Sequence, residues 1–188
     1  HEDDDDECET EESESVMEMR YSQRSKAAAK VQEGKVCSVS VLSGDPVVER
    51  NSTFQAHIAQ INSIDQVHQV QAFLLSQPKI ARATHNITAY RFECVNPSTG
   101  SVSIVHDNDD DGERKAGSRL AHLLQLSNSM NVYVMVSRWF GGTLLGSDRF
   151  TLINECARAL LDRSGLIGHR QDHSINKDKD KQNKKGRS

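Results

Sequence analysis

The chain has 188 residues, 36% of them hydrophobic and 27% charged, and its net charge is −4. Residues 1–15 carry ten acidic residues and no Lys or Arg, whereas residues 169–188 carry seven Lys or Arg against three Asp. The middle of the chain is therefore close to neutral, which argues against a large nucleic-acid footprint. No apolar run approaches 18 residues, so the sequence predicts neither membrane spanning nor secretion.

The composition predicts one folded domain between two extensions. Charged runs bury too little apolar surface to offset their ordering entropy, so we expect an acidic, mostly disordered linker over residues 1–35 and a basic disordered tail over 166–188. The domain would then occupy residues 36–165. The four cysteines lie far apart and form no Cys-x-x-Cys pair, so we predict no zinc or redox site and a reducing, cytoplasmic setting.

The first half of the predicted domain alternates strands with one helix. Alternating polarity predicts a strand over Val36–Leu42 and a second over Ser52–Ile58. Ser63 is the predicted cap of a helix that ends near Ser76, closed by Pro78. A hairpin is then predicted, with strands Asn86–Val95 and Ser101–Val105 around a turn rich in Asn, Pro and Gly.

The second half reads as helix, strand and helix. We predict a helix over Ala116–Leu126, a strand over Val132–Trp139 and a last helix capped by Ser147 that stops near Gly165. The inner face of that last helix would carry four apolar residues, Phe150, Ile153, Ala157 and Leu160. This order of elements predicts an α+β two-layer sandwich, with the helices on one face of a mixed sheet.

An acidic stretch precedes the middle helix. Asp107–Gly112 matches the opening of an EF-hand loop, but Ser118 stands where that loop needs a bidentate Glu, so no EF-hand is predicted. We interpret the acidic residues as favourable neighbours of a helix start, with a weak magnesium site as the alternative. The candidate residues are Asp110, Asp111, Gly112 and Glu113.

A glycine-rich loop joins the last strand to the last helix. Such a junction can hold an anion through backbone N–H groups, although the spacing is neither a P-loop nor a dinucleotide fingerprint. The other interpretation is that the glycines permit positive φ and tight strand–helix packing, and we favour it. Candidate anion- or partner-binding residues are Arg138, Gly141, Gly142, Gly146 and Arg149, with Trp139 beside them.

His85, next to Asn86, stands at the entry of a predicted strand, where a histidine is more often structural than catalytic. No Ser or Cys lies in a recognisable nucleophile motif, so we predict no catalytic residue, no cofactor and no metal. The basic tail lacks aromatic residues, so any contact with nucleic acid there would be nonspecific.

Several stretches, in order, resemble one family. They are Ser52–His57, Ala83–Arg91, Asp110–Glu113 with Ala116 and Gly117, Val136–Gly142 and Leu145–Phe150. Taken together they are similar to the conserved C-terminal domain of the IMPACT family of translational regulators, which small bacterial proteins share. The resemblance covers about residues 51–161.

This resemblance implies the fold of the second domain of ribosomal protein S-five. It also implies a non-enzymatic regulator that restrains the starvation-activated kinase of initiation factor two by competing for the kinase's ribosome-associated coactivator. Monomeric actin would be a further partner. The family's regulators carry an N-terminal RWD domain, whereas this chain has an acidic segment there and begins with His1, which suggests a fragment.

Three hypotheses follow. The first is a cytoplasmic protein-binding regulator of translation under stress, with Arg138, Trp139 and Arg149 as contact residues. The second is an RNA- or ribosome-binding module that uses the glycine loop and the basic tail. The third is an enzyme acting on a phosphorylated ligand, which requires His85, the acidic residues and the glycine loop to converge in one concave site. We favour the first.

Overall fold

The computed structural model describes residues 15–16, 18–24 and 38–168, and within these residues six strands form one sheet. The strand order is β1-β3-β6-β4-β5, with β2 also paired to β3, and every pairing is antiparallel. The strands are β1 (Val41–Ser43), β2 (Val47–Glu49), β3 (Ser52–Gln60), β4 (His85–Val95), β5 (Val102–Asp109) and β6 (Val132–Trp139).

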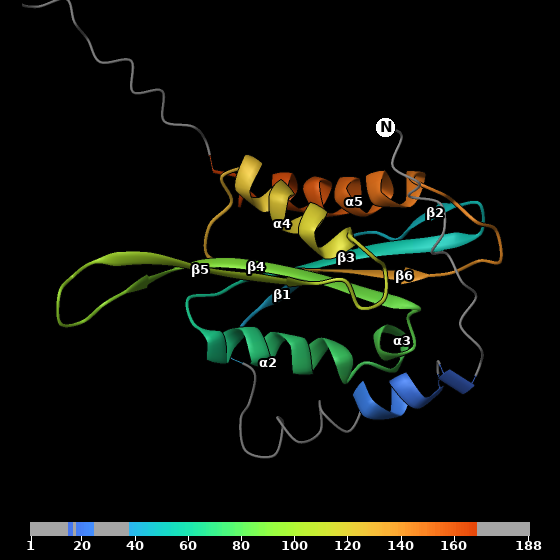
Figure 1. Cartoon of the computed structure of the whole chain (residues 1–188), viewed down its shortest axis with the longest axis horizontal. Helices are drawn as coiled ribbons and strands as arrows, with labels where there is room; N and C mark the ends of the chain where they lie inside the picture. Colours follow the sequence, from blue (N-terminus) through green and yellow to red (C-terminus); the bar gives the residue numbers. More distant parts are fainter. Residues whose placement is uncertain (1–14, 17, 25–37, 169–188) are drawn as a thin grey trace, which may run out of the picture.

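Helices cover both faces of this sheet, as Figure 1 shows. One face carries α4 (Ala116–Leu126) and α5 (Asp148–Ser164), and the other carries α2 (Ile64–Leu75) and the short α3 (Pro78–Ala81). Residues 18–24 form a further helical segment, the N-terminal helix, below α3 in the view of Figure 1.

Each face has its own hydrophobic core because strand side chains alternate between faces. On β6 the side chains of Val132, Val134 and Val136 join the core under α4 and α5, while Tyr133 and Met135 join the core under α2 and α3. A strand buried on both faces is apolar almost throughout, which explains the near-continuous hydrophobic run of β6.

The α+β prediction is confirmed, but the predicted two-layer sandwich with helices on one face of a mixed sheet is wrong. The pairings are all antiparallel among the described residues, and α2 packs on the face opposite to α4 and α5. The apolar run of β6 already required two covered faces.

Several predicted boundaries also hold. Ser63 caps α2 by accepting a hydrogen bond from Gln66 N at 3.3 Å, and α4, β6 and the end of α5 at Gly165 lie where predicted. Ser147 is not a side-chain cap, because it already has helical φ and ψ. The first N–H groups of α5 bond instead to carbonyls three residues back, as Phe150 N does to Ser147 O at 3.1 Å.

Other predictions need correction at their edges. The first strand covers only Val41–Ser43, while Val36 and Cys37 lie outside the described residues, and β2 was not predicted. The hairpin strand predicted to end at Val105 continues to Asp109, so part of the acidic stretch is strand. Of the predicted linker and tail, residues 15–16, the N-terminal helix and residues 166–168 are described, and the N-terminal helix and residues 166–168 contact the domain; the rest lies outside the described residues.

Candidate functional site

A row of three side chains crosses the sheet on the face covered by α4 and α5. Phe54 of β3 pairs with Arg138 of β6, and Arg138 pairs with His85 of β4, so strand register alone places them side by side. The guanidinium carbon of Arg138 lies 5.7 Å from the ring centres of both Phe54 and Phe140. Two aromatic rings thus lie within cation–π distance of the arginine, an arrangement that favours a cation.

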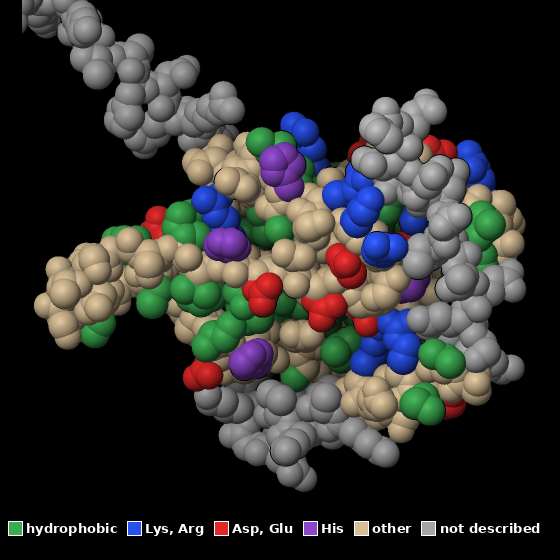
Figure 2. Space-filling model, viewed as in Figure 1, with side chains coloured by type: hydrophobic (Ala, Val, Ile, Leu, Met, Phe, Trp, Pro, Cys, Tyr) green, Lys and Arg blue, Asp and Glu red, His purple; other side chains and the backbone are tan. Residues whose placement is uncertain are grey.

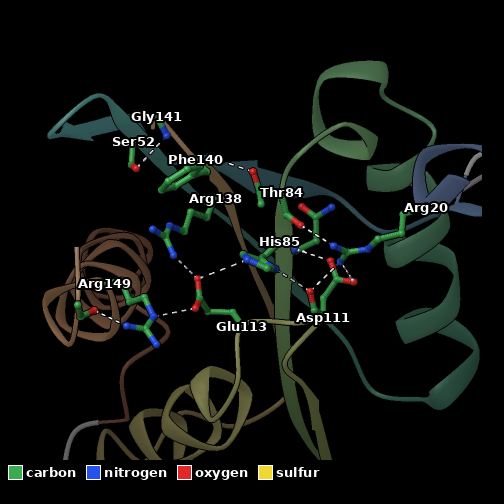
Figure 3. Close-up of polar contacts among 12 residues, drawn as sticks. Arg20, Ser52, Thr84, His85, Asp111, Glu113, Arg138, Phe140, Gly141 and Arg149 are labelled. Carbon is green, nitrogen blue, oxygen red and sulfur yellow. Dashed lines mark hydrogen bonds and ion pairs between the residues drawn. The ribbon is translucent and has the colours of Figure 1, made fainter. Parts of the chain in front are cut away.

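Glu113, from the loop before α4, lies over this row and binds two arginines (Figure 3). Arg138 Nη1 donates to Glu113 Oε2, and Arg149 Nε donates to Glu113 Oε1 at 2.8 Å. All three side chains are 2% exposed. His85 Nε2 lies 3.7 Å from Glu113 Oε2. These four residues, the Glu113 cluster, join β4, β6, α5 and the loop before α4.

Arg149 belongs to the cluster because of its place on α5. It is four residues before Ile153 and seven before Cys156, both buried, so it shares the inner face of the helix. Its Nη1 donates to Gly146 O at 2.5 Å, and its guanidinium carbon lies 4.4 Å from the centre of the Phe150 ring. Its position on the inner face directs its charge to Glu113.

Asp111, two residues before Glu113, is the centre of a second set of contacts. It has a φ of 45°, and its Oδ2 accepts from Asn86 N at 2.6 Å. Its backbone oxygen accepts from His85 Nδ1 at 2.9 Å, so this nitrogen carries a proton. Its carboxylate also forms ion pairs with Arg20 and Arg24 of the N-terminal helix.

Asn86 faces away from the Glu113 cluster, on the side of α2 and α3. Its Nδ2 donates to Ile80 O at 2.9 Å, and its Oδ1 accepts from Ser137 Oγ at 2.6 Å. The pair Asn86–Ser137 follows the pair His85–Arg138 in the same register, so neighbouring residues serve opposite faces. Asn86 therefore ties β4 to β6 and to α3.

Asp110 and Gly112 complete the acidic turn. Asp110 Oδ1 accepts from Gly117 N at 2.7 Å and its Oδ2 from Lys115 N at 3.1 Å, so the side chain satisfies N–H groups at the start of α4. Gly112 has a φ of 89°, which glycine adopts without strain. Among residues 15–16, 18–24 and 38–168, no three His, Cys, Asp or Glu side chains are arranged to hold a metal.

The glycine loop is built around backbone contacts. Gly141 N donates to Ser52 Oγ at 3.2 Å, and Phe140 N donates to Thr84 Oγ1 at 2.9 Å. A Cβ at Gly141 would lie 2.1 Å from the backbone of Asn51. Two loop N–H groups are thus already used, which favours tight packing over the cradling of an anion.

The other glycines and Trp139 have different surroundings. Gly142 and Gly146 have φ values of 89° and 56°. A Cβ at Gly142 would contact nothing within 4 Å. Trp139 points to the opposite face of the sheet, where its Nε1 donates to Lys79 O at 3.1 Å and Lys79 Nζ lies 5.1 Å from the ring centre.

The predicted residues converge on a set of buried ion pairs. His85, Glu113, Arg138 and Arg149 meet, and Gly141 of the glycine loop lies above them in the view of Figure 3. Two surface hollows in the described part of the chain measure about 360 and 410 Å³, and none of these four residues lines either of them. Both carboxylate oxygens of Glu113 accept from arginines, so the arrangement is suited to holding elements together.

Sequence reasoning missed five residues that complete these contacts. Arg20 and Arg24 lie in the segment predicted to be a linker, and their spacing of four residues on a helix was the available signal. Hydroxyl groups supply the remaining contacts, from Ser52, Thr84 and Ser137. All three lie within the motif stretches Ser52–His57, Ala83–Arg91 and Val136–Gly142, and that membership was the available signal for them.

The fold and the buried ion cluster define an α+β domain whose shared motifs hold its layers together. The family model described as "Impact N-terminal domain" matches residues 50–161, and the chain belongs to the IMPACT family. That description places the domain at the N-terminal end, so the C-terminal position that the resemblance implied is corrected. In the described part of the chain, no helix has both the length and the apolar character needed to cross a membrane.

Curated relatives and one solved structure show the extent of the likeness. Protein IMPACT of Rattus norvegicus is 48% identical over 144 residues, which are 76% of this chain and 44% of that protein. Protein IMPACT of Homo sapiens is 51% identical over 118 residues, 63% of this chain and 36% of that protein. The matched region thus spans less than half the length of these relatives.

A solved structure of Yih1, described as a two-domain translational regulator, is 38% identical. It matches with a TM-score of 0.49 over 68% of this chain and 48% of that chain.

Proposed function

We propose that this chain is a translational regulator that restrains the starvation-activated kinase of initiation factor two. It would do so by competing for the kinase's ribosome-associated coactivator, and it would act in the cytoplasm. The observation that carries this proposal is membership of the IMPACT family across residues 50–161, the region that contains the whole described sheet except β1 and β2. Monomeric actin is proposed as a second partner on the same ground.

The contacts of the motif residues support a binding protein over an enzyme. Glu113 gives both carboxylate oxygens to arginines, and His85 Nε2, the ring nitrogen that does not bond to Asp111 O, faces Glu113 Oε2 at 3.7 Å. A general base needs a free lone pair within reach of its substrate, and these groups are turned towards each other. We therefore propose that the chain has no catalytic activity of its own.

Contact residues for a partner would have to lie elsewhere than in the cluster. Arg138 and Arg149, which the sequence suggested as contact residues, are 2% exposed, so a partner cannot reach their charges without opening the domain. Trp139 and Lys79 stack on each other at the surface beside α3 and offer a cation and an aromatic ring to a protein partner.

The test is a pulldown from amino-acid-starved cell extract with the whole chain as bait, with ribonuclease added to half of each sample. Retention of the coactivator despite ribonuclease supports the proposal. Recovery of ribosomal components alone, lost with ribonuclease, would overturn it in favour of an RNA-binding module. In starved cells, expression of the chain should also lower phosphorylation of initiation factor two.

A matched pair of variants separates binding from catalysis. His85→Asn keeps an N–H donor near the position of Nδ1 but removes the ring, so a scaffold role predicts coactivator binding within about twofold of wild type. Trp139→Ala removes a surface aromatic and should weaken that binding by about tenfold if the surface beside α3 is the contact. Loss of the cellular effect in His85→Asn with intact binding would favour the enzyme hypothesis.

A further inference from the structure

The end of α3, the residues that follow it and Asp111 together present acceptors to two arginines. Arg24 Nη1 donates to Ala81 O and to Ala83 O, both at 3.0 Å. Arg20 Nη1 donates to Thr84 O at 3.0 Å. The carbonyls after a helix end have no partner within the helix, so they accept hydrogen bonds from elsewhere.

Asp111 supplies the negative charge of this surface. Arg20 Nη2 donates to Asp111 Oδ1 and to the Asp111 backbone oxygen, both at 2.7 Å, and Arg24 Nη2 donates to Asp111 Oδ2. Each carboxylate oxygen thus receives one arginine (Figure 3 shows Arg20 and Asp111). The left-handed backbone at Asp111 turns its carbonyl and its carboxylate towards the same side chain.

The two arginines reach these acceptors because they are four residues apart on a helix and so share one face. Between them, Tyr21 lies under the guanidinium of Arg82, with 4.7 Å between the guanidinium carbon and the ring centre. Figure 2 shows Lys and Arg side chains gathered over the region of α3. The Arg20 and Arg24 side chains are only 20% and 11% exposed, so the contact covers them well.

We infer that the surface formed by Ala81 O, Ala83 O, Thr84 O and Asp111 is an arginine-recognition site. Its ligand class is a helical peptide with two arginines four residues apart, and the chain's own N-terminal helix is the occupant in this structure. Carbonyl and carboxylate acceptors around planar groups select guanidinium over ammonium, since a lysine cannot reach three acceptors from one fixed fork. The inference goes beyond the proposed function and stands without it.

An occupant in the same chain has a consequence for any partner. A segment tethered by a short connection has an effective concentration on the order of millimolar, so a partner helix must outcompete it. The N-terminal helix therefore sets a threshold: only a partner with a better-placed pair of arginines, or a change that weakens the N-terminal helix, gives access to the site.

The experiment uses the full chain with Arg20→Gln/Arg24→Gln, which vacates the site, and a fluorescein-labelled peptide of residues 15–28. Fluorescence anisotropy should show saturable binding to this double variant and binding at least about tenfold weaker to the wild-type chain, whose site is occupied. Adding Asp111→Asn to the double variant should weaken peptide binding by about tenfold or more, because the charge is lost while an oxygen remains.

Peptide variants keep the test independent of folding in the triple variant. Against the double variant, in which Asp111 is intact, a peptide with both arginines changed to glutamine should not bind. A peptide with both changed to lysine should bind at least about fivefold more weakly. Equal binding of the arginine and glutamine peptides, or no saturable binding of the arginine peptide, would overturn the inference.

Discussion

Two carboxylates only two residues apart, Glu113 and Asp111, have contrasting surroundings. Glu113 is 2% exposed and bound by two arginines that are 2% exposed. Asp111 is 24% exposed and bound by Arg20 and Arg24, which lie before the residues that the family model matches. The first carboxylate serves the interior of the domain, and the second holds a segment against its surface.

The contrast shows that an ion pair between a carboxylate and an arginine affects stability differently when it is buried and when it is partly exposed. A buried pair stabilises little in net terms but is costly to break, because removal of one partner leaves a charge without water. A partly exposed pair stabilises modestly and can be broken at small cost. The domain should therefore depend on Glu113 for folding and use Asp111 for reversible contact.

The largest expected effect comes from Glu113→Gln. It removes the negative charge and leaves Arg138 and Arg149 buried together, so we expect the free energy of unfolding to fall by about 3–5 kcal/mol. Urea unfolding followed by circular dichroism measures the change. The matched control is Glu155→Gln at an exposed position of α5, expected to change stability by less than about 0.5 kcal/mol. Equal effects of the two variants would remove the distinction between the buried and the exposed carboxylate.

The buried side chain of His57 provides a second comparison with Glu113. His57 is 2% exposed and hydrogen bonds through Nδ1 to Ser43 Oγ at 2.8 Å. Burial, with a smaller contribution from the charge of Lys79, lowers the pKa of His57 from 6.5 to about 4. Glu113 is paired with two buried arginines, whereas burial holds His57 in its neutral form.

The sign of the pH effect follows from that lowered pKa. The unfolded state binds a proton near pH 6.5 and the folded state only near pH 4, so this stability is present above pH 6.5 and is lost as the pH falls to 4. At about 1.4 kcal/mol per pH unit the loss approaches about 3 kcal/mol. His57→Gln should flatten the difference in unfolding free energy between pH 6.5 and pH 4. An unchanged slope would contradict the assignment.

The glycine loop offers an intermediate effect. Gly141→Ala places a methyl group 2.1 Å from the backbone of Asn51, so we expect a loss of about 1–3 kcal/mol from overpacking. In Gly142→Ala the added methyl group has no atom within 4 Å, so the expected loss of unfolding free energy is about 1 kcal/mol and comes from the positive φ alone. Thermal unfolding of the two variants compares them directly. A smaller loss for Gly141→Ala would contradict the packing interpretation of the loop.

The sequence predicted elements where local signals and packing agree. Ser63 begins a helix, and Val132–Trp139 is a strand because β-branched residues there fill two cores. The two-sided sheet was missed, although that apolar run carried the evidence for it. The prediction that Ser147 caps the last helix was wrong, because the first N–H groups of α5 already donate to carbonyls three residues earlier.

The sequence predicted which residues form the candidate site, but not that its two arginines are buried. The motif residues do converge, yet the sequence suggested that Arg138 and Arg149 face the glycine loop as contact residues. Arg138 is two residues after Val136 and four after Val134 on a strand, so it shares their buried face. Arg149 is four residues before the buried Ile153 on a helix, so it lies on the inner face of that helix. Charge type alone cannot show burial, because burial depends on a partner such as Glu113 that is distant in the sequence.

The smallest expected effect is that of Asp111→Asn. The amide keeps an oxygen for Asn86 N, so the loss is confined to the charge that Arg20 and Arg24 share, about 1 kcal/mol of unfolding free energy. Because these groups are partly exposed, the loss should shrink in 1 M salt, where the screening length is about 3 Å, whereas the loss in Glu113→Gln should persist.

A double-mutant cycle separates the contact from the fold. If the two arginines act through Asp111, Arg20→Gln/Arg24→Gln and Asp111→Asn should give losses that do not add, with a coupling of about 0.5–1 kcal/mol. Additive losses would mean that the carbonyls of Ala81, Ala83 and Thr84 hold the arginines alone. A salt-insensitive loss would mean that Asp111, like Glu113, belongs to the interior, and the N-terminal helix would then be part of the fold.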